Sequence, residues 1–427
     1  PYSSLGSKSL ISCGVEVILT LLLPELHGIT ITVSPSKSAP ERRSATLLLI
    51  PMASFGVLPR TLRASACLLL TVRIGISKVP PCGYNDNEIL YFDIETTGFS
   101  PVGTYLYLIG CAYYCDGGYC FRQFFLDDTA DEKAMIEYFI DFIHNFKCII
   151  HYNGSGFDIP YIIRKCEIYN IPCDFTGISS LDIYKTILPV KSVFNLENLK
   201  QKTVERFMGI EREDKYSGGE LINIYNEYIR TNNDELLSFL LMHNHDDVCG
   251  MINISDMLSY AGLINDGYTF ESIEMRDSSA LGTPRKEAVI TCRLANPVPE
   301  RVSAGNDRYY FTAYSDILRI CITAYTSELK YFYPDYKNYY YLPKEDRSIH
   351  KSVAFYVDKN YRTRAKAANC YSRKTGLFLP QSDEIVSPYF KIDYYDKITY
   401  FEYLPEFTQN PELILRYVRH ILRILIQ

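Results

Sequence analysis

The sequence contains no tryptophan, and its 13 cysteines include no pair spaced as CxxC. The tightest group is Cys111, Cys115 and Cys120, which has no histidine nearby and lies in a stretch expected to form a hairpin. This arrangement argues against a zinc site. A long chain with scattered cysteines and no convincing secretion signal is typical of a reducing compartment. We therefore expect free thiols and a cytoplasmic protein.

Residues 1–80 lack asparagine and aspartate and contain a single tyrosine, Tyr2, although the rest of the chain is rich in all three. The apolar run at residues 44–59 includes two prolines and is too short to cross a bilayer comfortably. The segment also lacks the charged start, single apolar core and cleavage site of a signal peptide. We expect a poorly structured N-terminal extension, translated from sequence upstream of the true start. A membrane or targeting role is the alternative for this segment, and for the remaining chain we expect no membrane association.

Charge is distributed unevenly along the chain, although the formal net charge is only −6. Residues 1–80 carry eight Lys and Arg against three Asp and Glu, and residues 265–427 carry 23 against 20. Residues 81–264, in contrast, carry 13 against 27. An acidic segment is a poor nucleic-acid surface by itself. It is a suitable place for a cluster of metal-binding carboxylates.

Residues 86–264 show the pattern of one α/β domain. Short apolar runs bounded by turn signals predict strands, and apolar residues at helical spacing predict helices. We expect strands at residues 88–95, 105–114, 119–125 and 148–152, and helices at residues 131–146, 158–169, 196–207 and 234–260. Three strands in a meander, a helix, a strand and further helices predict a mixed β-sheet flanked by helices.

Residues 268–427 have a different pattern. Alternating stretches at residues 308–313, 317–324 and 399–404 predict antiparallel strands, and the apolar stripe of residues 412–427 predicts a final helix. We expect a C-terminal α+β domain rich in antiparallel strands, whose role is unknown. Within it, residues 350–374 contain seven Lys and Arg against one Asp, with tyrosines interleaved. Both a single-strand groove and a solvated basic face fit this stretch.

Two acids stand at the end of the first strand of the middle domain. Asp93 and Glu95 are two residues apart, so their carboxylates project from the same face of a strand. Adjacent acids repel each other unless a cation lies between them. A single DxE pattern is weak evidence, because strand ends often carry two acids by chance.

A third acid follows a loop of small residues. The sequence from Tyr152 to Asp158 predicts a strand, a glycine-rich loop and an acid at the start of a helix. Such an acid can simply cap the free amides of the helix and interact with its dipole. Consecutive strands usually lie side by side, however, so the same geometry predicts a third carboxylate beside the first strand.

A fourth acid lies in a long apolar helix, within the sequence HNHDD. His243 and Asp247 are four residues apart and therefore share one face of the helix. Burial of such groups is costly unless they have partners. For His245 and Asp246 we favour a structural role, whereas the other three acids favour a functional one for His243 and Asp247.

Four carboxylates on three elements, with one histidine, predict the chemistry of phosphodiester hydrolysis. Two divalent ions held about 4 Å apart by carboxylates can activate a water and stabilise the leaving oxygen. Hard oxygen ligands favour Mg²⁺ or Mn²⁺ over zinc. An imidazole nearby can accept the proton of the water near neutral pH.

Three motifs in this order resemble those of the DEDD superfamily of 3′–5′ exonucleases. They are FDIETTGF at residues 92–99, HYNGSGFDIP at residues 151–160 and HNHDDV at residues 243–248. More narrowly, residues 88–262 resemble the YprB-type RNase H-like exonuclease family, including the intervening SLDIYKTILP. The resemblance implies an RNase H-like fold and a magnesium-dependent nuclease that acts on DNA or RNA, which we expect to degrade a single-stranded end.

The resemblance also implies roles for individual residues. Asp93 is expected to bind both metal ions, and the shells are completed by Glu95, Asp158 and Asp247. His243 is expected to orient or deprotonate the attacking water. Residues expected near the terminal nucleotide are Thr96, Thr97 and Asn153, although turn geometry also explains each of these.

Two other functions remain open from the sequence. One is a catalytically weak RNase H-like scaffold that binds nucleic acid, which the intact set of acids disfavours. The other is a phosphatase of the haloacid dehalogenase type, because Asp93, Glu95 and Thr97 imitate its first motif. A phosphatase of this type usually has a second aspartate where this sequence has Glu95. The phosphatase hypothesis also gives no role to the loop and acid at residues 153–158.

Overall fold

The computed structural model describes residues 15–23, 26–33, 68–74, 80, 82–115, 118–212, 218–278 and 285–426. The chain forms two compact units. The first contains residues 1–188 and 196–258, and the second contains residues 189–195 and 259–427.

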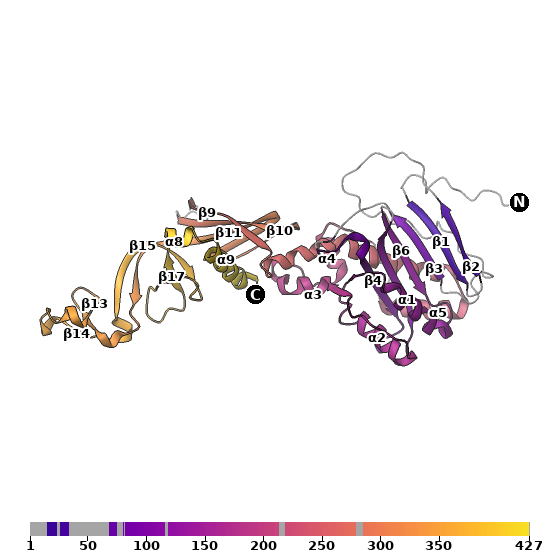
Figure 1. Cartoon of the computed structure of the whole chain (residues 1–427), viewed down its shortest axis with the longest axis horizontal. Helices are drawn as coiled ribbons and strands as arrows, with labels where there is room; N and C mark the ends of the chain where they lie inside the picture. Colours follow the sequence, from indigo (N-terminus) through magenta and orange to yellow (C-terminus); the bar gives the residue numbers. More distant parts are fainter. Residues whose placement is uncertain are drawn as a thin grey trace. The chain divides into compact units, whose positions relative to one another are not determined.

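The described part of the first unit contains an eight-stranded mixed sheet with the order β2-β1-β3-β6-β5-β4-β7-β8 (Figure 1). Its strands are β1 (Val15–Leu23), β2 (Leu26–Val33), β3 (Leu68–Ile74), β4 (Ile89–Thr96), β5 (Leu106–Cys115), β6 (Gly118–Phe125), β7 (Cys148–His151) and β8 (Ser179–Asp182). β4 pairs antiparallel with β5 and parallel with β7. β4 therefore lies inside the sheet, with other elements covering both of its faces.

Helices cover both faces of this sheet. They are α1 (Glu132–Ile143), α2 (Asp158–Tyr169), α3 (Ile183–Ile187), α4 (Gln201–Phe207), α5 (Gly218–Thr231) and α6 (Asp234–Ile254). Alternation along β4 assigns the faces, because neighbouring side chains point to opposite sides. The ring of Phe92 packs 5.8 Å from that of Phe139 on α1, whereas Asp93 on the opposite face meets α6. The predicted mixed sheet with flanking helices is confirmed.

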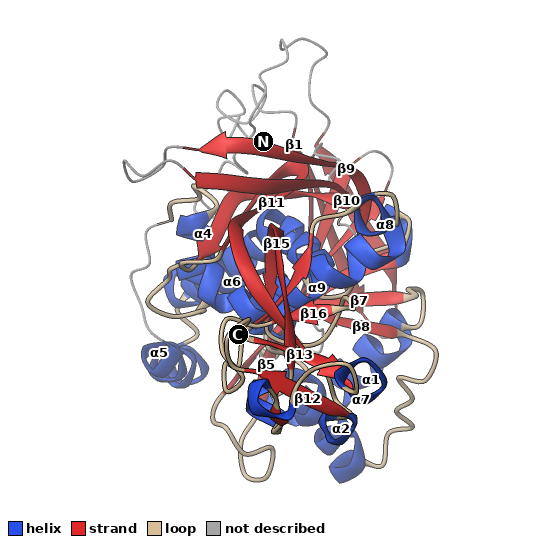
Figure 2. Cartoon of the chain, turned by 90° about the vertical axis from the view of Figure 1, so that its left-hand side faces the viewer, coloured by secondary structure: helices blue, strands red, loops and turns tan. Residues whose placement is uncertain are grey.

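The second unit consists mainly of antiparallel strands. Its larger sheet has the order β16-β17-β15-β11-β10-β9. A smaller sheet has the order β13-β12-β14, with β12 at Tyr339–Leu342, β13 at Arg347–His350 and β14 at Thr363–Arg364. The long strands β11 and β15 run side by side towards β12 and β13 (Figure 2). The strands of the larger sheet are β9 (Tyr268–Ser278), β10 (Arg285–Gly305), β11 (Tyr309–Phe332), β15 (Tyr371–Gln381), β16 (Tyr389–Phe390) and β17 (Thr399–Glu402). The predicted C-terminal antiparallel sheet is therefore confirmed.

The last helix of the second unit buries one face. α9 (Pro411–Ile426) follows the short helix α8 (Pro405–Thr408) and contacts β9, β10 and β11. Its fully buried side chains recur at helical spacing. They are Ile414, Tyr417, Val418, Ile421 and Leu422. Among the described residues, no helix combines the length and apolar character needed to cross a bilayer.

The cysteines of the β5–β6 hairpin differ from the sequence expectation. Cys115 and Cys120 form a disulfide, although free thiols were expected throughout. The hairpin register places Cys115 opposite Gly118 and Cys120 opposite Tyr113, and the Cα atoms of the two cysteines are 6.3 Å apart, within the range that a disulfide spans. Cys111 is a buried free cysteine, so the three residues do not act as one cluster.

Within residues 1–80, for which we expected a poorly structured extension, the structure describes residues 15–23, 26–33, 68–74 and 80. Three strands within residues 1–80 continue the sheet beyond β6, and β3 pairs antiparallel with β6 along its whole length. Their sequences, such as ITITV at residues 29–33, are rich in β-branched residues, which favour strands. The apolar run at residues 44–59 lies outside the described residues.

We predict that a chain beginning at Pro81 folds and retains any activity of the complete chain. β4 is separated from β3 by β5 and β6, and the described core cluster of the first unit spans residues 90–241. Circular dichroism melts of the two chains, measured side by side, check this. A truncated chain without a cooperative transition would show that β1–β3 are an essential part of the sheet.

Candidate metal centre

Strand β4 presents two acids on the face that α6 covers. Asp93 lies opposite Gly110 of β5, and Glu95 lies opposite Leu108. Phe92, which precedes Asp93, and Ile94, which lies between the two acids, point to the other face and are buried in the core. The alternation of the strand thus separates an apolar face from a carboxylate face, as the sequence pattern predicted.

The third acid reaches β4 from α2. β7 runs parallel to β4, and the loop after β7 leads directly into α2, whose first residue is Asp158. The Oδ1 atom of this buried carboxylate accepts a hydrogen bond of 3.2 Å from the amide of Ile94. This amide lies between the two acids of β4. The side chain of Asp158 is therefore directed at the carboxylate face and does more than cap its own helix.

The fourth acid and the histidine come from α6. The Nε2 atom of His243 lies 3.2 Å from Oδ2 of Asp247 and 3.7 Å from Oε1 of Glu95. One ligand atom from each of these three residues lies within 4.8 Å of the others, which is compact enough to hold a metal ion. Burial lowers the pKa of His243, although the charge of Asp247 opposes the effect. A neutral imidazole can accept a proton or a metal.

The electrostatics of this cluster favour a cation. Burial raises the pKa of Asp93 well above its usual range, and the charges of Asp158 and Asp247 raise it further. Burial, again with those two charges, raises the pKa of Glu95 to about 8. Burial also raises the pKa of Asp158 to about 7. The acids therefore resist ionisation together, and a divalent cation with hard oxygen preference would relieve that cost.

Asn244 is a member of the site that the sequence analysis did not identify. It is fully buried, and its Nδ2 donates to Oδ2 of Asp93 over 3.1 Å, while its Oδ1 accepts from Nε2 of Gln123 over 3.0 Å. Gly110 permits this approach, because a Cβ atom there would lie 1.9 Å from Oδ1 of Asn244. A glycine within an apolar strand was the available signal, since it often marks a close approach.

Arg212 is a second unrecognised member. Its guanidinium, which is almost fully buried, pairs with Oδ1 of Asp247 and lies 2.8 Å from Oε2 of Glu205. Gln201 donates to both the backbone oxygen of Asp247 and the carboxylate of Glu205. Gly250 allows α4 to approach α6, because a Cβ atom there would lie 2.0 Å from Oε1 of Glu205. This network fixes the position of the Asp247 side chain.

The three residues expected near a nucleotide have local structural partners. The hydroxyl of Thr96 donates to the backbone oxygen of Gly98, and the hydroxyl of Thr97 accepts from the amide of Tyr105. Asn153 has a φ of 62°, which suits the turn after β7. Thr96 is the last residue of β4, Thr97 follows it and Asn153 lies shortly after β7, but the contacts of all three in the structure are those of turns.

Asp182 shapes the loop that leads to Asp158. This buried carboxylate accepts hydrogen bonds from the amides of Asn153 and Ser155, and from the hydroxyl of Ser155. His151 lies beside it, with Nδ1 3.6 Å from Oδ2. Burial lowers the pKa of His151 to about 4, so this imidazole is neutral at pH 7. Asp182 belongs to the SLDIYKTILP stretch, and its role is to hold the loop.

The other two polar residues of the HNHDD stretch lie away from the acids. The ring of His245 packs 4.7 Å from that of Phe121 on β6, and its nitrogens lie near Sγ of Cys249. The Nδ1 atom of His245 lies 3.5 Å from Oδ1 of Asp246. These contacts place His245 on the packing face of α6.

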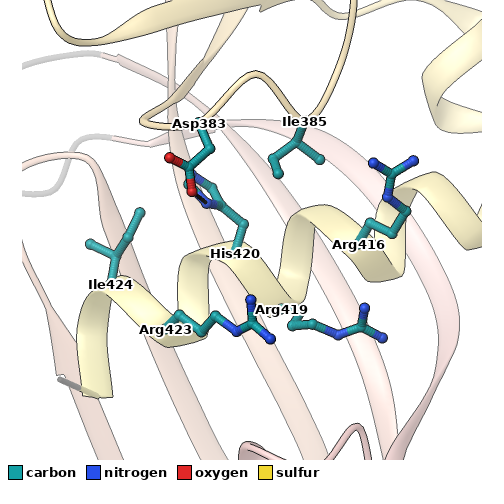
Figure 3. A pocket seen from close by; sticks show the side chains of 7 residues that line it. All are labelled: Asp383, Ile385, Arg416, Arg419, His420, Arg423 and Ile424. Carbon is teal, nitrogen blue, oxygen red and sulfur yellow. Dashed lines mark ion pairs between the residues drawn. The ribbon is translucent and has the colours of Figure 1, made fainter.

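The second unit contains a cavity of about 460 Å³ along α9 (Figure 3). Its charged lining consists mainly of Arg416, Arg419, Arg423 and His420. Arg419 pairs with Asp266 outside the lining, and His420 accepts a hydrogen bond from the amide of residue 382. Guanidinium groups bind anions, so the cavity does not offer a second metal centre.

Comparison with known proteins agrees with the description of the first unit. The family model of the RNase H superfamily matches residues 90–259. The uncharacterized protein YprB of Bacillus subtilis (strain 168) is 26% identical over 179 residues, which are 40% of this chain and 42% of YprB. DNA polymerase 1 of Aeropyrum pernix is 31% identical over 55 residues, which are 13% of this chain and 6% of the polymerase. The chain thus spans less than half of the length of these relatives.

Two solved structures are also similar in part. The family B DNA polymerase of Pyrobaculum calidifontis is 18% identical, with a TM-score of 0.35, over 41% of this chain and 25% of the polymerase. The E. coli ExoI–ssDNA complex in its zinc-bound form is 12% identical, with a TM-score of 0.24, over 48% of this chain and 54% of that chain.

The matched residues contain β4, the loop before α2 and the part of α6 that carries His243 and Asp247. All four clustered acids thus fall inside the matched segment. Residues 90–259 therefore match the model of the RNase H superfamily, and 179 residues of the chain are similar to YprB.

Proposed function

We propose that the first unit is a metal-dependent 3′–5′ exonuclease that hydrolyses phosphodiester bonds of DNA or RNA with two divalent ions. The observation that supports this most strongly is the set of acids that β4, α2 and α6 bring together, in which burial raises the pKa values of Asp93, Glu95 and Asp158. Such a set is costly to the fold unless cations compensate it. A structural role alone does not explain why the fold keeps a cluster of acids that reduces its stability.

Each side chain has a place in this mechanism. Asp93, Glu95, Asp158 and Asp247 would hold Mg²⁺ or Mn²⁺ ions, which supply Lewis acidity and a more acidic water when bound. His243, beside Glu95 and Asp247, accepts the proton of the attacking water. The buried guanidinium of Arg212 pairs with Asp247 and keeps that carboxylate in place.

The substrate is a strand end, which the residues after β4 and β7 would receive. Thr96, Thr97 and Asn153 are the residues we propose beside the terminal nucleotide. Phe99 is 92% exposed, and its ring lies 6.2 Å from that of Phe157, the residue before Asp158. An exposed ring at this position offers a stacking surface for an unpaired base.

We predict that Asp247→Asn abolishes hydrolysis while Asp246→Asn does not. The two substitutions remove the same charge from adjacent residues, but only the first removes a proposed metal ligand. The rate for Asp247→Asn should fall by at least about 10³-fold, a loss typical of removing charge stabilisation from an active site. Labelled single- and double-stranded DNA and RNA, incubated with Mg²⁺, Mn²⁺ or EDTA, provide the measurement. Equal activity of both variants, or full activity in EDTA, would refute the metal mechanism.

We predict that Asp93→Asn stabilises the metal-free protein. The amide preserves the shape of the side chain and can still accept from Asn244, but it removes one of several mutually repelling buried charges. The melting temperature in EDTA should rise by at least about 2 °C, the change that about 1 kcal/mol produces in a domain of this size. Added Mg²⁺ should stabilise the wild-type chain more than the variant. A lower melting temperature of the variant in EDTA would contradict the proposed repulsion.

We predict different effects for the two histidines of α6. His243→Ala should reduce the rate by about 10²–10⁴-fold, the usual contribution of a positioned acid–base group. His245→Ala should affect the melting temperature more than the rate, because its ring packs on Phe121. Single-turnover rates and melting curves of both variants check this. Small and equal losses of rate would exclude His243 from proton transfer and leave the carboxylates as the only catalytic side chains.

A further inference from the structure

The second unit carries a small projecting lobe that the proposed hydrolysis does not use. We define the basic–aromatic lobe as residues 339–369. It contains β12 (Tyr339–Leu342), β13 (Arg347–His350), α7 (Lys351–Ala354) and β14 (Thr363–Arg364). Within the second unit, β13 and β14 lie beyond the ends of β11 and β15, away from α9 (Figure 1). Its core is small, and most of its side chains face solvent.

Large apolar side chains of this lobe are exposed. Phe355 and Tyr356, which follow α7, are 78% and 86% exposed, and their rings meet edge to face at 5.5 Å. Val353 and Tyr361 are also more than half exposed. Several exposed apolar groups close in sequence within one small lobe exceed the scattered single residues of an ordinary surface. These exposed side chains therefore indicate a binding surface.

The rings lie among cations. Arg362 and Arg364 both lie over the ring of Tyr340, at 4.9 and 5.0 Å from its centroid. Lys344 lies 4.6 Å from the centroid of Tyr361. These contacts hold the charges against flat aromatic faces while the cationic groups remain hydrated at the surface.

The positive charge of the lobe is not cancelled within it. Lys351, Lys359 and Lys366 are exposed, and among the described residues none of the three forms an ion pair. The lobe contains seven Lys and Arg against three acids, Glu345, Asp346 and Asp358. The carboxylate of Asp358 accepts a hydrogen bond from the amide of Asn360. The lobe therefore presents net positive charge to solvent.

The basic residues just after the lobe behave differently. Arg373 pairs with Glu328 and with Asp346, and Lys374 pairs with Glu402. Their charge is compensated by the neighbouring strands. The sequence suggested one basic tract over residues 350–374, whereas the structure confines its uncompensated charge to residues before 370.

We propose that the basic–aromatic lobe binds single-stranded nucleic acid. Phosphates would lie on the exposed Lys and Arg side chains, and unpaired bases would stack on Phe355 and Tyr356. A duplex offers no free base face to such rings, so a single strand is the better fit. An anionic membrane surface also attracts cations, but the arginines stacked flat on Tyr340 form surfaces suited to planar bases.

This inference deepens the proposed function, because it assigns the substrate strand a second binding site on the same chain. Tethering a binding site to a nuclease raises the local concentration of substrate without any new catalytic contact. The binding itself does not depend on hydrolysis, so the two proposals can fail separately.

The test measures binding by the full chain in EDTA, where the proposed metal chemistry is absent. Fluorescence anisotropy with a labelled 20-nucleotide oligo-dT gives the Kd, and a duplex of the same length is the comparison. We expect the single strand to bind more tightly than the duplex. Phe355→Ala combined with Tyr356→Ala should raise the single-strand Kd by about tenfold or more. Tyr395→Ala is the matched control, because that ring is 82% exposed in the same unit but has Asp393 and Asp396 beside it. Its Kd should stay within about twofold of wild type.

A charge variant provides an independent measurement. Lys359→Gln combined with Lys366→Gln should reduce the slope of log Kd against log salt by about 1.4, because each phosphate contact with a single strand contributes about 0.7. Melting curves of all variants establish that they are folded. Unchanged Kd values in both double variants would overturn the proposal. It would also be overturned if the aromatic variant lost binding to phosphatidylglycerol vesicles but kept binding to the oligonucleotide. A wild-type chain that binds oligo-dT in EDTA yet hydrolyses nothing with Mg²⁺ would refute the nuclease and support the lobe.

Discussion

Mutual repulsion among buried carboxylates is the constraint around which the first unit is organised. Asp93 and Glu95 project from one strand, and Asp158 and Asp247 come from α2 and α6, two helices that follow this strand in sequence. The protein supplies donors to individual oxygens: an amide of β4 to Asp158, and Asn244 to Asp93. Neutral donors lower the cost of each charge but do not cancel the charges. The cluster therefore favours the binding of cations, and in our proposal cation binding is the basis of its chemistry.

The close packing of the unit around these acids follows from the same constraint. Asn244 can reach Asp93 only because Gly110 leaves β5 without a side chain at that position. On the other side of α6, Gly250 leaves space for Glu205, whose partner Arg212 also holds Asp247. A methyl group added at residue 110 would push α6 away from β5, and one added at residue 250 would push α6 away from α4. The two glycines thus have a role in positioning the acids, although neither supplies a ligand to the proposed metal site.

The sequence predicted those parts of the site that depend on local periodicity. A strand repeats every two residues and a helix every 3.6, so the shared faces of residues 93 and 95 and of residues 243 and 247 follow from spacing alone. Partners distant in sequence were not predictable in this way. Gln123 and Asn244 are 121 residues apart, and Arg212 lies in a stretch without periodicity. Strands β1–β3 were missed for a related reason: composition distinguished their segment from the rest, but it carries no information about pairing with β6.

The two units differ in net charge, and in our proposal they also differ in role. Residues 81–264 carry twice as many acids as bases, so the segment that contains the candidate metal centre would repel a polyanion until cations bind. A nuclease with this composition gains from a binding surface of opposite charge elsewhere on the chain. The lobe around Tyr340 and Tyr356 provides such a surface, and it lies in the unit that contributes no acid to the cluster. Catalysis and capture of the strand make opposite electrostatic demands, because one requires concentrated negative charge and the other requires positive charge. Placing them in different units satisfies both without weakening either.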